Sequence, residues 1–173
     1  GCAKVFSYNI CRNYRNSYGM KIWNGILFNH ESPRRGTNFV TNKFVKAAVR
    51  IKLGLQNQLE MGNMDSYRDW GHSKDYVRAM HLIMNHTVAD DFVVATGESR
   101  SVRDMCKYVF GQLGLNYEDY IVQNPKFLRP EELNDLKGDH SKLKKHTGWE
   151  PTYTFESMLD EMIEYWLKYY SKK

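Results

Sequence analysis

Residues that could bind an anionic ligand are concentrated at positions 24–36, where the sequence reads Asn-Gly-Ile-Leu-Phe-Asn-His-Glu-Ser-Pro-Arg-Arg-Gly. The guanidinium groups of Arg34 and Arg35 could grip phosphate through paired N–H donors, or they could be solvated. His30, judged on spacing alone, is a loop histidine satisfied by backbone, and no second histidine follows at the spacing of a zinc-binding helix. Asn29 suits either a ligand contact or a turn.

Two further arginines suit the same chemistry. Arg68 lies in Tyr-Arg-Asp-Trp-Gly and Arg129 precedes Pro130, so neither belongs to a predicted amphipathic helix. Each could bind a diphosphate with two N–H groups at once. The alternative is a structural ion pair with a neighbouring carboxylate: Asp69, Glu131 or Glu132. Lys43 could reach a nucleotide from its helix or be solvated.

A metal site is not indicated. Trp70, His72 and Asp75 favour packing beside a capped helix, because two polar residues do not coordinate an ion. The three cysteines are far apart, without the pairing of a zinc site or a disulfide framework, which indicates reduced thiols in a cytoplasmic protein. No apolar run approaches the ~20 residues of a membrane span, and residues 1–15 lack the order of a signal peptide.

The composition indicates a folded protein. Of the 173 residues, 42% are hydrophobic and 14% are aromatic, which is enough to build a core and argues against disorder. The 25 basic and 20 acidic residues are spread along the chain. The net charge of +5 therefore predicts a mild attraction for anions and does not indicate nucleic-acid binding.

Strands that alternate with helices predict an α/β fold. Residues 4–18 have the spacing of a helix, which Gly19 stops, and the apolar run within residues 21–28 predicts a buried strand. Residues 29–36 are then the loop at the carboxyl end of that strand. Open α/β sheets bind their ligands at this end.

The rest of the chain predicts four more helices and one short strand. One helix covers residues 40–51, and the strand covers residues 92–95. The other helices begin at capping residues: Ser73, Ser101 (with Asp104 as a capping box) and Thr154. The apolar side of the helix after Ser73 is expected to be Tyr76, Val77, Met80 and Met84. Residues 59–70 are irregular or β, and residues 117–138 are loop or short strand.

These motifs resemble those of one family. Residues 24–36 are similar to the signature of the GDP-mannose 4,6-dehydratases, which belong to the extended short-chain dehydrogenase/reductase superfamily. Further stretches match the same family in the same order: 62–72, 95–98, and 129–132 followed by Gly138-Asp139. Residues 1–4 resemble the end of the superfamily's Tyr-x-x-x-Lys motif, so we expect the tyrosine to fall immediately before Gly1.

The resemblance implies an α/β fold: the C-terminal part of a Rossmann-type extended short-chain dehydrogenase/reductase, with its smaller α/β substrate-binding domain. Residues 1–36 would be the remnant of the dinucleotide-binding domain. Residues 37–173 would mainly form the substrate domain, with 73–96 returning to the Rossmann sheet. No glycine-rich dinucleotide fingerprint occurs in the sequence, so we expect this part of the enzyme to be inactive alone.

In this family NADP takes hydride from C4 of GDP-mannose and returns it to C6 after water has left, which gives GDP-4-keto-6-deoxy-mannose. Lys4 matches the lysine of the motif and is the one catalytic residue expected here. Its ammonium would favour the phenolate of the tyrosine and bind the ribose of NADP. His30 and Arg35 match cofactor-binding positions. The positions matched to the substrate are Asn29, Lys43, Arg68, Arg129 and Glu132.

The implied partners are GDP-mannose, the N-terminal half of the enzyme, and further copies in a homodimer or homotetramer; the resemblance implies no metal, nucleic acid or membrane. The helix of residues 4–18 is the kind of element that extended members use at their dimer interface. Asn134 stands where an aspartate is usual, which weakens the match just downstream. Two alternatives stay open: a non-catalytic nucleotide-sugar-binding module, and an epimerase or reductase of the same superfamily. The motif of residues 29–36 favours the dehydratase.

Overall fold

Two short parallel strand pairs run through the middle of the computed structural model, which describes residues 1–128 and 131–172. β1 (Asn24–Leu27) pairs with β6 (Asp91–Val94), and β2 (Asn29–Glu31) pairs with β5 (Trp70–His72). The Phe28 N–H donates to the Val94 carbonyl, so the chain passes directly from β1 into β2 while its strand partner changes. The prediction that residues 29–36 form a loop is therefore wrong for the first three of them. These residues pair with β5, which is distant in sequence, so the residues around position 29 give no indication of a strand.

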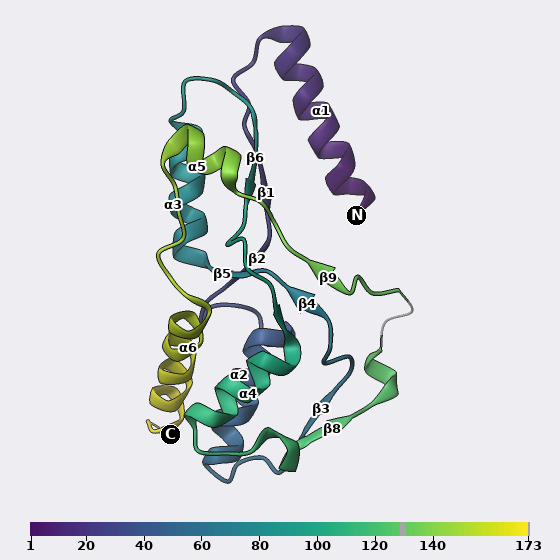
Figure 1. The fold of residues 1–173 in the computed structure, drawn as a ribbon, viewed down its shortest axis with the longest axis vertical. Coiled ribbons are helices and arrows are strands. Elements are labelled where there is room, and N and C mark those ends of the chain that lie inside the picture. The colour runs from purple at the N-terminus through teal and green to yellow at the C-terminus, as the bar shows by residue number, and fades with distance from the viewer. Residues whose placement is uncertain (129–130, 173) are drawn as a thin grey trace.

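Helices lie on both sides of the β1–β6 pair. α3 (Ser73–Met84) and α5 (Ser141–Thr147) cover one side, and α1 (Cys2–Tyr18) lies on the other (Figure 1). A hydrophobic cluster joins α3, α5 and β6; its largest members are Tyr76, Phe92 and Trp149. No residue of α1 is buried, so this helix contributes nothing to either core. The sequence did not predict α5.

The other hydrophobic core is built from α2 (Val40–Lys52), α4 (Val102–Gln112) and α6 (Phe155–Tyr170), which pack on one another. The buried residues recur at helical spacing, for example Phe44, Ala48 and Ile51 on α2. The predicted apolar face of the last helix is confirmed by the burial of Leu159, Met162, Ile163 and Trp166.

Two predicted helix starts are confirmed and one is wrong. Ser101 and Asp104 form a capping box on α4, and Thr154 caps α6. The N-cap of α3 is His72 rather than Ser73, because the His72 ring accepts a hydrogen bond from the Lys74 N–H. The Ser73 hydroxyl instead donates to the Glu31 carbonyl and joins α3 to β2.

The predicted inward face of α3 is also wrong in most of its members. Val77, Met80 and Met84 are exposed, and only Tyr76 of the expected residues is buried. The helix turns Asp75, Tyr76, Ala79 and Ile83 towards the sheet instead. Two apolar faces compete on this helix, and the shape of the surface beneath it decides which one is buried.

Short strands form the edge that faces the functional site. β3 (Leu59–Met61) lies parallel to β8 (Ile121–Gln123), and β4 (Tyr67–Arg68) lies between β7 (Arg100–Ser101) and β9 (Asp135–Leu136). Two 3-10 turns, Tyr117–Asp119 and Pro125–Phe127, flank β8. No helix within residues 1–128 and 131–172 is long and apolar enough to cross a membrane.

Candidate functional site

Strand β2 separates two cavities. Side chains of a strand point alternately to its two faces, so His30 lies on the opposite face from Asn29 and Glu31. His30 lines a cavity between α1 and β1 together with Lys4. Asn29 and Glu31 line a cleft on the other side, between α2 and the short strands β3 and β4. The family motif of residues 29–31 thus supplies residues to two adjoining sites.

The cavity between α1 and β1 has a volume of about 710 Å³. Within the described residues, Lys4 makes no side-chain hydrogen bond or ion pair, so its ammonium is available to a ligand. The His30 Nδ1 lies 2.8 Å from the Phe28 carbonyl, which makes Nδ1 the donor; in the neutral ring Nε2 is then an acceptor. The His30 ring also stacks on Tyr76 at 5.1 Å between centroids, which fixes its plane.

The cleft, of about 560 Å³, brings together four of the five residues that the resemblance assigned to the substrate. They are Asn29, Lys43, Arg68 and Glu132. The fifth, Arg129, lies outside the described residues. Arg35, which the resemblance assigned to the cofactor, lines this same cleft rather than the cavity that contains Lys4 and His30.

Three contacts orient Arg35. Its Nε lies 3.3 Å from the Glu31 carboxylate, which is almost wholly buried. Its guanidinium lies over the Phe39 ring, 3.7 Å from the centroid. The Asn42 side chain donates to the Arg35 carbonyl and accepts from Trp166 Nε1, which ties the loop to α6. Burial raises the pKa of Glu31 above its ordinary value, although the charge of Arg35 opposes the shift.

Arg68 is more heavily engaged by the protein than Arg35. Its Nη1 donates to the carbonyls of Tyr67 at 2.6 Å and Leu133 at 2.7 Å, and its Nη2 lies 3.3 Å from the Glu132 carboxylate. The structural ion pair weighed from the sequence is therefore present, with Glu132 as the partner. Arg68 keeps few donors for a ligand.

Lys43 also has partners in the protein. Its ammonium donates to the Glu60 carbonyl at 2.8 Å and lies over the Phe127 ring at 4.6 Å. Burial lowers the pKa of Lys43, while Glu60 opposes the shift. Arg35 and Lys43 are thus the cations that face the cleft from its α2 side.

Asp69 does not pair with Arg68, which corrects one of the ion pairs considered from the sequence. The Asp69 carboxylate is fully buried and accepts hydrogen bonds from the Thr96 N–H and hydroxyl, the Gly97 N–H and the Gly138 N–H. Three of the family motifs therefore meet at one side chain. In the sequence, the only indication of a role for Asp69 was its position beside Arg68 in a polar motif. That position does not distinguish a structural role from a ligand-binding role.

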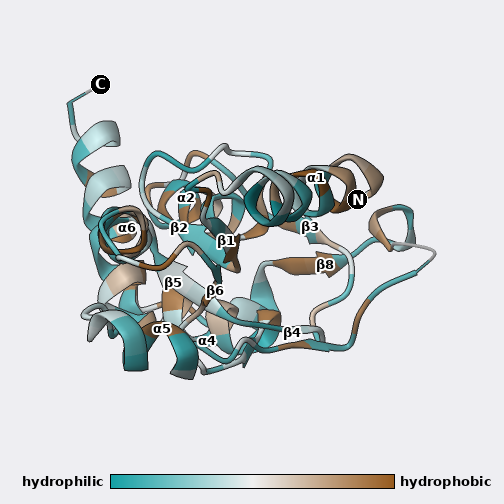
Figure 2. Cartoon of the chain, turned by 90° about the horizontal axis from the view of Figure 1, so that it is seen from above, coloured by the Kyte–Doolittle hydropathy of each residue, from teal (hydrophilic) through white to brown (hydrophobic). Residues whose placement is uncertain are grey.

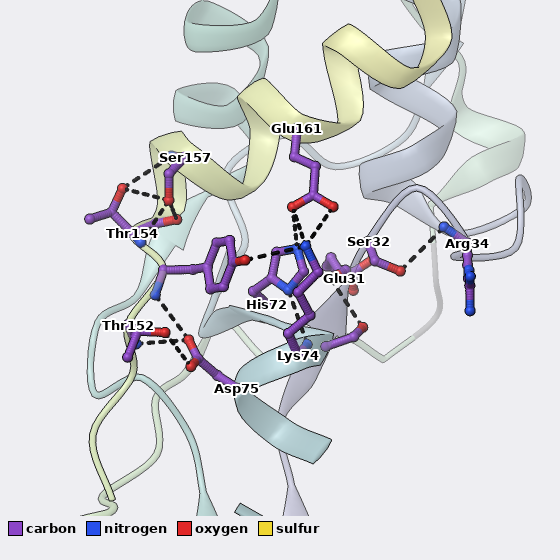
Figure 3. Close-up of polar contacts among 12 residues, drawn as sticks. Glu31, Ser32, Arg34, His72, Lys74, Asp75, Thr152, Thr154, Ser157 and Glu161 are labelled. Carbon is purple, nitrogen blue, oxygen red and sulfur yellow. Dashed lines mark hydrogen bonds and ion pairs between the residues drawn. The ribbon is translucent and has the colours of Figure 1, made fainter. Parts of the chain in front are cut away.

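A second polar network joins α3 to α6 and to the segment that precedes α6 (Figure 3). Glu161 of α6 points towards His72 at 3.1 Å and Lys74 at 3.0 Å, and the His72 ring stacks on Tyr153. Asp75 accepts hydrogen bonds from Thr152 and from the Tyr153 N–H. The packing role predicted for His72 and Asp75 is confirmed, since both are buried and bonded within the protein. Trp70 is buried as well, but it also lines the cleft.

The family is decided by comparison with known proteins. A model of the family described as GDP-mannose 4,6 dehydratase matches residues 1–162. The chain belongs to the GDP-mannose 4,6-dehydratase family. The recognition based on the motifs of residues 24–36, 62–72 and 95–98 is thereby confirmed.

Curated members of the GDP-mannose 4,6-dehydratase family are similar over most of this chain. GDP-mannose 4,6 dehydratase 1 of Arabidopsis thaliana is 49% identical over 152 residues, which cover 88% of this chain and 42% of the relative. GDP-mannose 4,6-dehydratase of Yersinia enterocolitica is 43% identical over 188 residues, covering 93% of this chain and 50% of the relative. The chain thus spans about half the length of these relatives or less.

Solved structures confirm the expected α/β fold of an extended short-chain dehydrogenase/reductase. RMD from Pseudomonas aeruginosa, complexed with NADPH, is similar with a TM-score of 0.85 and 26% identity, covering 93% of this chain and 53% of that one. UDP-glucose 4-epimerase from Thermotoga maritima, with UDP-glucose, has a TM-score of 0.86 and 25% identity, covering 98% and 53%. Because proteins with different names and ligands share this fold, the fold alone does not identify a function; the cleft and the family motifs are needed for that.

Proposed function

We propose that this chain provides the substrate cleft, and one wall of the cofactor cavity, of a GDP-mannose 4,6-dehydratase. The reaction converts GDP-mannose to GDP-4-keto-6-deoxy-mannose and water. The observation that carries the proposal is the placement of Lys4 and His30 in one cavity, and of Arg35, Lys43 and Glu132 in the cleft behind the same strand. A mere nucleotide-sugar-binding module has no need of the first cavity.

The cofactor proposed for the first cavity is NADP, and the NADPH bound to the related RMD supports this choice. When bound, its nicotinamide ring would accept the hydride and return it. Lys4 has an ammonium without a partner among the described residues, which suits the ribose hydroxyls and a neighbouring phenolate. His30, with Nδ1 held by Phe28, would present Nε2 as an acceptor to the carboxamide end of the cofactor.

The diphosphate of the substrate would lie against Arg35 and Lys43. Both cations line the cleft, and Arg35 faces Glu31 through Nε, so its terminal nitrogens, which have no hydrogen-bond partner among the described residues, can donate to a ligand. We therefore propose that Arg35 binds the substrate rather than the cofactor. Arg68 would act chiefly by holding Glu132, since protein carbonyls take both Nη1 donors.

We further propose the domain division stated from the sequence, with the boundary near residue 36, and an assembly that includes the family's N-terminal half and a second copy. The tyrosine of the Tyr-x-x-x-Lys motif and the glycine-rich dinucleotide fingerprint have no match in these 173 residues. The chain alone should therefore produce no keto sugar from GDP-mannose. The chain fused behind the N-terminal half of the Arabidopsis relative should produce it.

The decisive variant of the fused protein is Lys4→Met, which removes the charge and keeps the length. Turnover at neutral pH should fall about a hundredfold, the rate should recover partly at higher pH, and NADP affinity should drop. Lys107→Met on the exposed side of α4 is the matched control. A Lys4→Met protein with an unchanged pH profile and unchanged NADP affinity would contradict the proposed role of the cavity.

A further inference from the structure

Two phenylalanine side chains are exposed on the lining of the cleft. Phe39 is 44% exposed and Phe127 is 51% exposed, and both line the cleft between α2 and the short strands. Both rings lie outside the two hydrophobic cores that the described residues form. Burial in a core therefore does not explain why an aromatic ring stands at either position.

Each ring instead lies against one of the cations of the cleft. The guanidinium carbon of Arg35 is 3.7 Å from the centroid of the Phe39 ring, and Nζ of Lys43 is 4.6 Å from the centroid of the Phe127 ring. Both distances fall within the roughly 6 Å over which a ring face attracts a cation. The two cations proposed to bind the diphosphate are thus each paired with an aromatic ring.

The start of α2 fixes the place of Phe39. Its N–H donates to the Gly36 carbonyl at 3.1 Å, and its own carbonyl accepts the Lys43 N–H at 2.9 Å in the first turn of the helix. The Phe39 ring therefore lies over Arg35 on a backbone that is hydrogen-bonded on both sides.

A glycine fixes the place of Phe127. A side chain at Gly62 would collide with the Phe127 carbonyl oxygen, so the turn of Phe127 can lie against β3 only because this residue is glycine. The Asn124 N–H donates to the Met61 carbonyl at 2.7 Å and joins the same turn to β3. Gly62, the first residue of one family motif, thereby brings the Phe127 ring to Lys43.

A ring face holds a cation without occupying its N–H donors, because the attraction comes from the charge distribution of the π electrons. Arg68 shows the contrast, since its Nη1 donates to two carbonyl oxygens of the protein. Arg35 lies on a ring and keeps its terminal N–H groups for a ligand. Lys43 donates once, to the Glu60 carbonyl, and an ammonium has further donors.

We propose that Phe39 and Phe127 are positioning residues, each of which holds one cation of the cleft with its free N–H donors directed at the diphosphate of the substrate. This inference rests on the proposed function, because it takes Arg35 and Lys43 to bind that diphosphate. Long cationic side chains lose conformational freedom when they bind a ligand. The rings reduce this loss because they order both side chains before the substrate arrives.

The test removes each ring and keeps an apolar side chain, with Phe39→Leu and Phe127→Leu. Calorimetry with GDP, on the chain and on the fused protein, should show binding weakened about five- to tenfold in each variant, as expected for one partly exposed cation–π contact. In the fused protein, KM for GDP-mannose should rise by a similar factor while kcat stays within about twofold. Phe39→Tyr keeps the ring and should bind GDP as the wild type does.

Double variants distinguish positioning from direct contact with the ligand. In an Arg35→Ala background, Phe39→Leu should weaken GDP no further, because the ring then holds no cation. Phe127→Leu should likewise have no further effect in a Lys43→Ala background. A ring that touched the ligand itself would weaken GDP in both backgrounds, and this result would overturn the positioning role.

The chain contains a matched control outside the cleft lining. The Arg50 guanidinium lies 5.7 Å from the centroid of the Tyr170 ring, which pairs an arginine of α2 with an aromatic residue of α6. Tyr170→Leu should leave GDP affinity unchanged. Thermal unfolding establishes that each variant is folded, and it should change little for Phe39 and Phe127 because both are exposed.

The outcomes separate the inference from the proposed function. If both single leucine variants keep the wild-type affinity for GDP while the fused protein dehydrates GDP-mannose, the role of the rings is overturned and the activity stands. If Tyr170→Leu weakens GDP as much as they do, a specific role of the two rings is overturned. If the wild-type chain and the fused protein bind no GDP and no keto sugar forms, the inference and the proposed function are both overturned.

Discussion

Asp69 is a buried carboxylate that joins three segments distant in the sequence. Its oxygens accept hydrogen bonds from the N–H groups of Thr96, Gly97 and Gly138, and from the Thr96 hydroxyl. Burial of an ionised group is costly unless donors surround it, and here four donors do so. The family motif around Asp69 therefore has a structural function.

We expect Asp69→Ala to lower the free energy of unfolding by about 3 kcal/mol or more, because the buried donors lose a charged acceptor. Urea unfolding measures the change. The control is Asp139→Ala, since Asp139 accepts one N–H from Ser141 at an exposed position and should matter far less. Equal losses for the two variants would contradict the structural role of Asp69.

His72 couples the stability of the protein to pH. Its Nδ1 accepts the Lys74 N–H, so a proton on Nδ1 would break the cap of α3. Burial lowers the pKa of His72, and Lys74 acts in the same direction, whereas Glu161 and Asp75 oppose the shift. The unfolded chain binds this proton near pH 6.5 and the folded protein binds it at lower pH. The contribution of His72 to the free energy of unfolding is thus complete above pH 6.5. It is lost as the pH falls from there through the pKa of His72 in the folded protein, which is lower.

The measurement is the unfolding free energy at several values between about pH 7 and pH 5, for the wild type and for His72→Asn. Asparagine can still cap a helix and does not titrate. The wild type should lose stability over this range more steeply than the variant. Parallel curves would show that the pH dependence comes from other groups.

At the scale of elements, α1 is joined to the rest of the molecule mainly by polar contacts to Asp91. Arg15 lies 2.9 Å from its carboxylate, the Tyr8 hydroxyl donates to it at 2.9 Å, and Arg12 lies 3.7 Å away. Burial would raise the pKa of Asp91, but the hydrogen bonds from Arg15, Asn24 and Tyr8 hold it below the ordinary value. The helix has no apolar anchor of its own.

Asp91→Ala should therefore release α1 without unfolding the two cores. Hydrogen exchange of residues 2–18 should become faster by about tenfold or more, while the amides of α2 and α6 stay protected. Asp90→Ala is the matched control, because Asp90 pairs with Lys142 of α5 and makes no hydrogen bond or ion pair with α1 among the described residues, although its charge also acts on Arg15. Faster exchange throughout the chain would instead indicate global destabilisation.

At the scale of the whole molecule, one side of the chain presents apolar surface and an open strand. Val5, Phe6 and Tyr18 on α1 are 61%, 69% and 71% exposed, and hydrophobic residues are visible on this helix in Figure 2. Among the described residues, β1 pairs with β6 alone, so its other edge is free. Unpaired edges and apolar patches promote association.

We expect the chain on its own to associate with increasing concentration, and the fused protein of the activity test to do so much less. Sedimentation velocity over a concentration series measures this. Phe6→Lys should suppress the association. Met84→Lys, which adds the same charge at an equally exposed position on α3, should have little effect. Equal suppression by both would point to net charge as the cause.

The sequence predicted those parts of the fold that depend on local chemistry. The capping box at Ser101 and the apolar face of α6 follow from residues within a few positions of each other, so their patterns were sufficient. The face of α3 could not be predicted, because it carries two apolar sides and its neighbours come from elsewhere in the chain. The strand Asn29–Glu31 was missed for the same reason, since its partner β5 is distant in sequence.

The sequence by itself determined the family and the fold class, because the motifs preserve side-chain types in order along the chain. It also named a set of polar residues that line the two cavities: Lys4, Asn29, His30, Arg35, Lys43, Arg68 and Glu132. The tertiary structure decided how those residues are divided. The alternation of side chains on β2 puts His30 in the cavity that contains Lys4, and Asn29 in the cleft on the other side, which Arg35 also lines. It also joined Arg68 and Asn63 to Glu132, because contacts between segments distant in sequence exist only after the chain has folded.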